Sequence, residues 1–384
     1  MNTNTKPRVV RLLALAIVAL ALAGPARAEA LKKVIIGHTG DSCEAPVFAA
    51  YEKGFFRDEG LDVEMVKGDW NFFKEALAFG RISALQGLVM NYIKPIEQGL
   101  DAKFTAGIHR GCIHILSAKG SPIVRASDLK GRRIGVPALG SSPWVFAARV
   151  IGEIGGDIKR DVEWKPFPIG ELRLALLKGE VDAIAISDPI GEILLSEGVA
   201  QSVVNQLTDA PYKDEYCCVA VVSGKLARED PDAAARITRA LLKASLWVEH
   251  NPLAAAGLSH RGRYVNASVE LNARVLAKLD FVPSVEGARL AARTAAAALK
   301  NVGIVAPSTD VSALVERTFV RLPGLDDAWL KGVTVACEDR LSRDEILARP
   351  LPSSSTLDAA VAEPGCCAEV EPSPLIADSR TRAR

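Results

Sequence analysis

In this 384-residue sequence, four thiols and one imidazole form a group that could bind a soft metal ion or supply a nucleophile. They belong to Cys43, His109, Cys112, Cys217 and Cys218, which fall in segments that we expect to lie near one another. Three interpretations are open. The first is one disulfide, for example between Cys112 and Cys217 or Cys218. The second is buried cysteines that act as small apolar residues, and the third is a soft metal or thiol-reactive ligand held by the thiolates and His109. The sequence has no C-x-x-C or H-x-x-x-H spacing, so spacing gives the metal interpretation little support.

Small and polar residues follow two predicted strands, at the ends where α/β sheets bind ligands. Gly40, Asp41 and Ser42 come after the strand predicted at 33–37, and Gly140, Ser141 and Ser142 come after that at 132–136. A loop that starts a helix offers free N–H groups and the positive end of the helix dipole to a carboxylate, sulfonate or phosphate. Ser42 and Ser142 are equally well explained as helix N-caps, and Pro143 is a typical first helical residue.

Three further residues have both a binding and a structural interpretation. Trp70 follows the strand predicted at 63–66 and could stack on a ligand or pack in the core. Asp188 follows the strand predicted at 183–187 and could accept a hydrogen bond from a ligand or fix its own loop. His109 could hydrogen-bond a ligand or lie buried with its own partners.

An internal repeat predicts the elements that position these residues. Segments 33–53 and 132–154 each predict a strand, a loop and a helix. At nearly the same spacing, segments 76–84 and 175–183 each predict a helix end, a glycine and a buried strand. Strands that alternate with helices indicate largely parallel sheets, since parallel neighbours need crossover connections. The repeat therefore predicts two similar α/β lobes, with chance similarity between Ala-rich helices as the alternative.

The remaining pattern completes this expectation. Strands are predicted at 34–37, 63–66, 84–89, 102–108, 113–118, 134–136, 162–167 and 183–187, with a return strand at 217–223. Helices are predicted at 231–250, 268–280 and 285–302. Periodicity fades from Asp326, and the segment 350–384 has the composition of a mobile tail, so Cys337, Cys366 and Cys367 are assigned no role in the site.

The first 28 residues predict a cleaved signal peptide. Basic residues precede an apolar run at 12–23, which is followed by Ala26-Arg27-Ala28. Twelve apolar residues fall short of the roughly 20 needed to span a bilayer. The whole chain has 47 Lys and Arg against 46 Asp and Glu, without the basic excess of a nucleic-acid binder. We therefore expect export to the periplasm and no nucleic-acid partner.

Three segments resemble a known family. Segments 51–63 (YEKGFFRDEGLDV), 128–136 (DLKGRRIGV) and 179–183 (GEVDA), the last followed by Asp188-Pro189, are similar to type II periplasmic binding proteins. They resemble the nitrate/sulfonate/taurine branch, which is related to thiamine-pyrimidine precursor binding proteins, over roughly 33–322. The resemblance implies an α/β fold of two similar lobes with mostly parallel sheets and a ligand cleft between them.

The resemblance also predicts the division of the chain. The signal peptide covers 1–28, the first part of lobe 1 covers 29–118, lobe 2 covers 119–218, the return to lobe 1 covers 219–325, and the tail covers 326–384. The chain is expected to cross between lobes near 117–123 and 211–218, which would place His109, Cys112 and Cys217 at the floor of the cleft.

The function implied by the resemblance is that of a receptor of an ABC importer. It would be a monomer without catalytic activity or cofactor that captures a small anionic solute (an aliphatic sulfonate, nitrate or taurine-like) and delivers it to a membrane permease and its ATPase. The expected ligand-binding residues are Gly40, Asp41, Ser42, Cys43, Trp70, His109, Cys112, Ser141, Ser142, Asp188 and Cys217, with no metal ligand among them. Four alternatives remain: a receptor for a pyrimidine-type thiamine precursor, an enzyme with Cys112 as nucleophile and His109 as base, a soft-metal receptor, and a sensor subunit for a membrane kinase.

Overall fold

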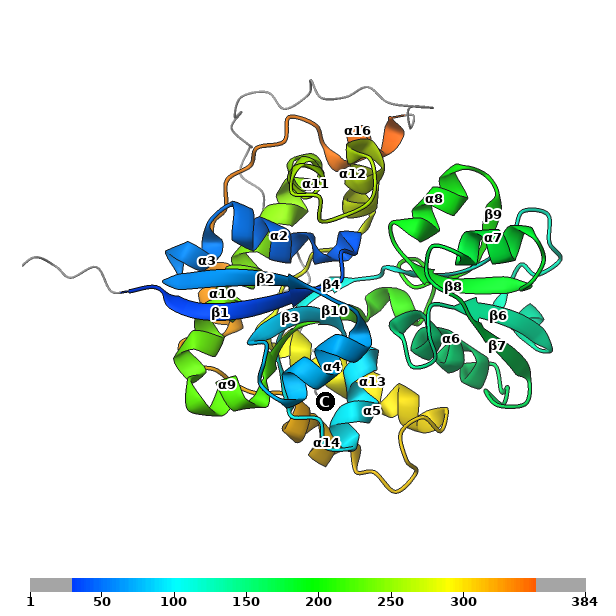
Figure 1. Cartoon of the computed structure of the whole chain (residues 1–384), viewed down its shortest axis with the longest axis horizontal. Coiled ribbons are helices and arrows are strands. Elements are labelled where there is room, and N and C mark those ends of the chain that lie inside the picture. Colours follow the sequence, from blue (N-terminus) through cyan, green and yellow to red (C-terminus); the bar gives the residue numbers. More distant parts are fainter. Residues whose placement is uncertain (1–29, 350–384) are drawn as a thin grey trace, which may run out of the picture.

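The computed structural model describes residues 30–349, and the predicted signal peptide lies outside them. Two five-stranded sheets form two bodies side by side (Figure 1). The first sheet has the order β2 (Leu61–Lys67), β1 (Lys32–His38), β3 (Ala84–Leu88), β10 (Tyr216–Ser223), β4 (Ala102–Arg110). β1 is parallel to β2 and β3, and β10 is antiparallel to both β3 and β4, so β10 alone is reversed in this sheet.

The second sheet repeats this plan. Its order is β7 (Val162–Pro166), β6 (Arg132–Val136), β8 (Ala183–Ser187), β5 (Ile113–Ala118), β9 (Ala200–Asn205). β6 is parallel to β7 and β8, and β5 is antiparallel to β8 and β9. In each sheet the reversed strand is the one that enters from the other lobe. The predicted fold of two similar, mostly parallel α/β lobes is confirmed.

Helices pack against both sheets, and the first lobe holds more of them. Around it lie α2 (Ala45–Glu52), α3 (Phe55–Asp58), α4 (Trp70–Ala78), α5 (Val89–Glu97), α9 (Gly224–Glu229), α10 (Pro231–His250), α11 (Pro252–Arg261), α12 (Val269–Lys278), α13 (Val285–Asn301) and α14 (Val311–Thr318). The second lobe carries α6 (Ser142–Glu153), α7 (Leu172–Leu177) and α8 (Ile190–Ser196). Short 3-10 turns lie at η1 (Ser42–Glu44), η2 (Ala126–Leu129) and η3 (Tyr212–Asp214).

The hydrophobic core explains why β10 is a continuous apolar run. All eight of its residues are buried, since helices cover the faces of its sheet and the strand lies between two neighbours. Large side chains such as Trp247, Phe48 and Phe104 fill the first lobe. Burying each contributes about 2–3 kcal/mol. Among residues 30–349, no helix is long and apolar enough to cross a membrane.

Two predicted boundaries are wrong. The strand at 113–118 is β5, which pairs with β8 and β9 in the second sheet, so the first crossing lies at Gly111–Cys112 rather than near 117–123, and lobe 2 begins there instead of at residue 119. The pattern of a buried strand does not specify which sheet the strand joins. The predicted tail is also wrong for residues 327–349, because α15 (Asp327–Lys331) and α16 (Arg343–Ala348) lie there. Residues 350–384 lie outside the described part.

The crossings between the lobes run close together. The return crossing joins β9 to β10 between residues 205 and 216. Gly111 has φ +66°, and a Cβ there would lie 2.6 Å from Leu207 Cδ1 of the return crossing. A glycine is therefore required where the two crossings touch.

Candidate functional site

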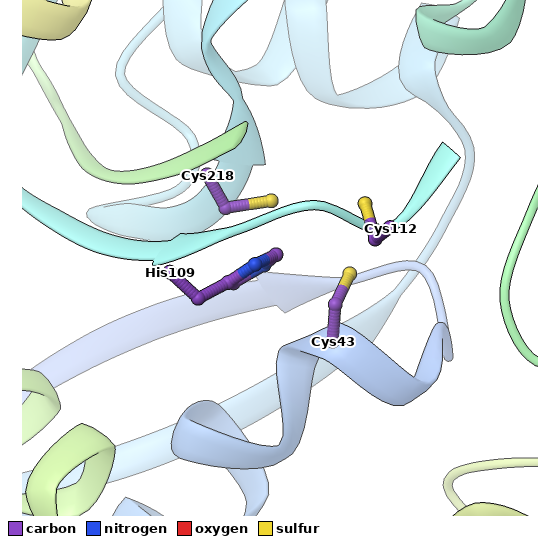
Figure 2. Close-up of side chains that lie close together, drawn as sticks. All are labelled: Cys43, His109, Cys112 and Cys218. Atoms are coloured by element: carbon purple, nitrogen blue, oxygen red, sulfur yellow. The ribbon is translucent and has the colours of Figure 1, made fainter. Parts of the chain in front are cut away.

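Four buried side chains meet at the floor between the lobes. They are Cys43, His109, Cys112 and Cys218, and their sulfur and nitrogen ligand atoms all lie within 4.8 Å of one another. Figure 2 shows the four side chains pointing toward a common centre. The predicted proximity of these residues is therefore observed, and Cys218, rather than Cys217, completes the group. We call these four residues the Cys-His cluster.

Each member comes from a different part of the first lobe or its crossing. Cys43 lies in η1 directly after β1, His109 is the second-last residue of β4, Cys112 lies in the first crossing, and Cys218 is the third residue of β10. The antiparallel pairing of β10 with β4 places Cys218 opposite His109. The register shifts on both sides of Cys218, an irregularity that re-aims side chains within a strand.

The imidazole of His109 has one satisfied nitrogen. Its Nδ1 lies 3.2 Å from the Arg110 carbonyl oxygen, whereas its fully buried Nε2 has no hydrogen-bond partner among the described residues. With the proton on Nδ1, the Nε2 lone pair is directed into the cluster. Burial lowers the pKa of His109, but interactions with Cys218 and with the backbone of Arg110 and Gly111 together raise it more, so the net direction is upward.

The thiols are held in their protonated form by their surroundings. Burial raises the pKa of Cys218 well above its usual value. The pKa of Cys43 is raised first by its hydrogen bond with Cys112 and also by burial. Without a cation these groups are therefore poor nucleophiles, because the thiolate is the reactive form.

Cys217 lies beside the cluster. Its Sγ is 3.1 Å from Cys112 Sγ and 3.1 Å from the Gln206 Oε1 atom. A disulfide bond is about 2.05 Å long. The structure thus shows Cys112 and Cys217 as free thiols in contact, without the disulfide that was one interpretation of the sequence.

The loop after β1 is wrapped around a buried carboxylate. Glu44 Oε2 accepts the N–H groups of Thr39 at 2.9 Å, Gly40 at 2.7 Å and Asp41 at 3.1 Å. Burial and the nearby Asp41 raise the pKa of Glu44 to about 7. The N–H groups of Gly40 and Asp41, which we expected to be free for an anion, already have a partner. Glu44 itself was not predicted, and a carboxylate directly before the apolar segment 45–50 was the only signal in the sequence.

Asp41 connects this loop to the second lobe. Burial raises its pKa to about 6, and its neighbours include Ser187 and Asp188 at the end of β8. Thr39 Oγ1 donates to its Oδ2 at 3.1 Å. Asp41 of the first lobe therefore lies close to Ser187 and Asp188 of the second.

The serines predicted as caps lie one residue away from the cap positions. Asp41, not Ser42, is the N-cap of η1, and Ser141, not Ser142, is the N-cap of α6. Ser42 Oγ is buried and has no hydrogen-bond partner among residues 30–349, while Ser141 Oγ donates to the Ala138 carbonyl at 2.7 Å. Ser142 is buried at the start of α6, next to the loop that contains Gly140.

Asp188 has a structural role at this site. Its Oδ2 lies 3.1 Å from Nε2 of the buried His114, and its Oδ1 accepts the Glu192 N–H at 3.0 Å. The carboxylate thus fixes the start of α8 and orients His114, which sequence reasoning missed because a histidine within a strand carries no distinguishing pattern.

Trp70 is used for packing. Its ring contacts Tyr92 edge-on, with 4.9 Å between ring centroids, and it lies against the core of the first lobe. Tyr92 is almost fully buried beneath it. The contact accounts for Trp70 without a ligand.

Comparison with known proteins agrees with the fold. A family model described as the NMT1-like family matches residues 27–260, more than half of the chain. The chain belongs to the NMT1-like family. Its relative YtlA of Bacillus subtilis (strain 168), which is named as a binding protein, is 23% identical over 247 residues, or 60% of this chain and 70% of YtlA.

Two solved structures show the fold shared by this NMT1-like chain. The alkanesulfonate-binding protein SsuA of Xanthomonas axonopodis pv. citri, bound to MOPS, has a TM-score of 0.62 and 19% identity, over 77% of this chain and 100% of SsuA. The periplasmic nitrate-binding protein NrtA of Synechocystis PCC 6803 has a TM-score of 0.64 and 14% identity, over 79% of this chain and 99% of NrtA. The predicted resemblance to periplasmic binding proteins is confirmed.

Proposed function

We propose that this chain is the solute receptor of an ABC importer in the periplasm, and that it presents a small solute to a membrane permease and its ATPase. The proposal rests on one observation. Polar side chains of the two lobes lie close together, near the two segments that cross between the lobes. Asp41 of the first lobe faces Ser187 and Asp188 of the second. Such an arrangement lets a ligand that touches both lobes favour their closed state. The binding proteins among the relatives and structural neighbours support it.

The charges around the cleft bear on the solute. An anion such as a sulfonate or nitrate has support at the start of α6, where Ser142 is buried, but not at the loop after β1, whose N–H groups bind Glu44. The carboxylates of Asp41 and Asp188 also oppose a simple anion by charge repulsion. Among the solutes predicted from the sequence, a taurine-like aminosulfonate carries both a sulfonate and an ammonium group. We therefore propose a taurine-like solute, with its ammonium group toward Asp41.

Calorimetric titration of the purified chain with taurine, ethanesulfonate and nitrate tests this proposal. Taurine is expected to bind, and Asp41→Asn is expected to weaken taurine binding at least tenfold, a change of about 1.4 kcal/mol. The matched control is Asp62→Asn on an exposed position of β2, which should bind taurine like the unmodified chain. Ethanesulfonate or nitrate binding as tightly as taurine would overturn the aminosulfonate assignment. Failure of all three, together with no small molecule retained after purification, would contradict the receptor itself.

The enzyme alternative has less support. A nucleophilic Cys112 would need to ionise near neutral pH. Its hydrogen bonds with Cys217 and Cys43 lower its pKa, but Cys218 and burial outweigh them and raise the pKa to about 12. His109, three residues away in the sequence, could accept the proton of Cys112, but a substrate would also have to reach the resulting thiolate.

A further inference from the structure

We propose that Cys43, His109, Cys112 and Cys218 form a closed binding site for a thiophilic divalent metal ion of the Zn²⁺ type. The inference goes beyond the proposed solute, because these ligands come from the first sheet and the first crossing and none from the loops of the second sheet. A metal ion there would join the turn after β1, the first crossing and β10.

The geometry of the Cys-His cluster fits four-coordinate binding. With a Zn–S distance of about 2.3 Å, the sulfur atoms of a tetrahedral site lie about 3.8 Å apart. The four ligand atoms are already within 4.8 Å of one another, so shifts of about an ångström would complete the tetrahedron. Three thiols and one imidazole are a ligand set of structural zinc sites, which leave no open position for substrate.

The backbone around the cluster fixes its members. Gln86 Nε2 donates to the Cys43 carbonyl at 2.6 Å, and the Asp188 N–H donates to the Cys112 carbonyl at 3.2 Å. The strand pairing between β4 and β10 fixes His109 and Cys218. Ligands held in this way lose little conformational freedom when they bind an ion.

An independent observation points to a ligand. The Nε2 atom of His109 is fully buried, has no partner within residues 30–349, and is aimed into the cluster. Leaving such a buried group unpaired is unfavourable. Its Nδ1 lies within hydrogen-bond distance of a backbone carbonyl, as metal-bound histidines commonly arrange the second ring nitrogen. A metal ion would satisfy the orphaned atom.

Charge favours a divalent over a monovalent ion. Three thiolates with Zn²⁺ leave one net negative charge in the buried site, whereas Cu⁺ with three thiolates leaves two. A net charge is costly to bury, so the ion that leaves the smaller net charge is preferred. Binding would release the thiol protons, since a coordinating thiol is deprotonated.

The test uses the full chain, reduced and stripped of metal with a chelator. Zn²⁺ is expected to bind at one equivalent with proton release, and Co²⁺ is expected to give the thiolate charge-transfer and tetrahedral d–d absorption bands. Cys218→Ser and His109→Gln should each weaken Zn²⁺ binding at least about tenfold. Cys217→Ser is the matched control, because this buried neighbour lies outside the cluster and its loss also prevents a Cys112–Cys217 disulfide; it should bind Zn²⁺ normally.

Several results would overturn the proposal. These are octahedral Co²⁺ bands, unchanged Zn²⁺ affinity in a folded Cys218→Ser variant, or no metal binding after full reduction. One-equivalent binding of Cu⁺ without Zn²⁺ binding would overturn the divalent assignment. The cobalt spectra are recorded on the unmodified chain, so they test the proposal even if a variant fails to fold. Titrating the same preparations with taurine separates failure of the metal site from failure of the solute receptor.

Discussion

The Glu44 carboxylate changes what the loop after β1 can bind. It accepts three consecutive backbone N–H groups, at Thr39, Gly40 and Asp41, so the turn that presents Cys43 is built on an internal anion. An external anion would have to displace a group that is already buried and hydrogen-bonded. A thiophilic cation at Cys43 meets no such competitor, whereas an ammonium group at Asp41 would share the carboxylate with the Thr39 hydroxyl.

Gly111 allows a residue-scale prediction about the crossings. Gly111→Ala should destabilise the chain by two effects, the left-handed φ of +66° and the contact of its Cβ with Leu207. The first effect costs about 1–2 kcal/mol, and crowding adds about 1–3 kcal/mol. The free energy of unfolding in urea measures the sum.

Gly131→Ala is the control for this prediction. Gly131 has a similar φ of +73°, but a Cβ there would meet no atom within 4 Å, so only the backbone effect should appear. Equal losses of stability in the two variants would show that the crossings do not press against each other at Gly111.

At the scale of elements, α10 and α16 are joined through a partly buried carboxylate. Glu249 near the end of α10 accepts the Phe281 N–H at 2.9 Å and pairs with Arg343 at the start of α16. Burial raises the pKa of Glu249 to about 7 although Arg343 lowers it. α16 is therefore docked on the first lobe through a group whose ionisation is unfavourable there.

This raised pKa predicts a pH dependence of stability. Because the folded state binds the Glu249 proton more tightly than the unfolded state, its contribution is fully present below about pH 4.5 and is lost as pH rises through about 7. Glu249→Gln should flatten this decline by at most about 1.4 kcal/mol per pH unit. Urea unfolding between pH 5 and 8 measures it, with Glu229→Gln at an exposed position as control. An unchanged slope in Glu249→Gln would contradict the assignment.

At the scale of the whole molecule, an ion pair bridges the two lobes beside the cleft. Lys278 of α12 lies 2.7 Å from the carboxylate of Glu192 in α8, and the Glu192 side chain is only 4% exposed. The helices that carry them approach each other between the two bodies (Figure 1). The pair therefore joins the two lobes in this structure.

Removing Lys278 should shift the chain toward an open form. Lys278→Ala leaves the buried Glu192 without its ion-pair partner, so we expect a larger radius of gyration in X-ray scattering and a solute affinity about two- to fivefold lower. Lys53→Ala breaks a pair with Glu338 at 2.6 Å that lies within the first lobe, and should change neither quantity. The same radius in Lys278→Ala as in the unmodified chain would show that this pair does not hold the lobes together.

Local patterns in the sequence determined the elements. The helix predicted at 231–250 and the strands predicted at 113–118 and 183–187 match α10, β5 and β8 to the residue. Apolar periodicity, an initial proline and short buried runs depend only on neighbouring residues, so one sequence suffices. The edge strand β9 was missed because its residues, AQSVVN, have neither clear alternation nor an apolar run.

The tertiary structure decided which elements meet. Two similar α/β lobes and a group of cysteines near the crossings could be predicted from the sequence, because both follow from repeats and order along the chain. The sequence did not determine that β5 joins the second sheet, that Glu44 occupies the N–H groups after β1, or that Cys218 faces His109 while Cys217 faces Cys112. Each of these depends on pairing between residues far apart in the chain, and a strand register shifted by one residue would exchange the two thiols.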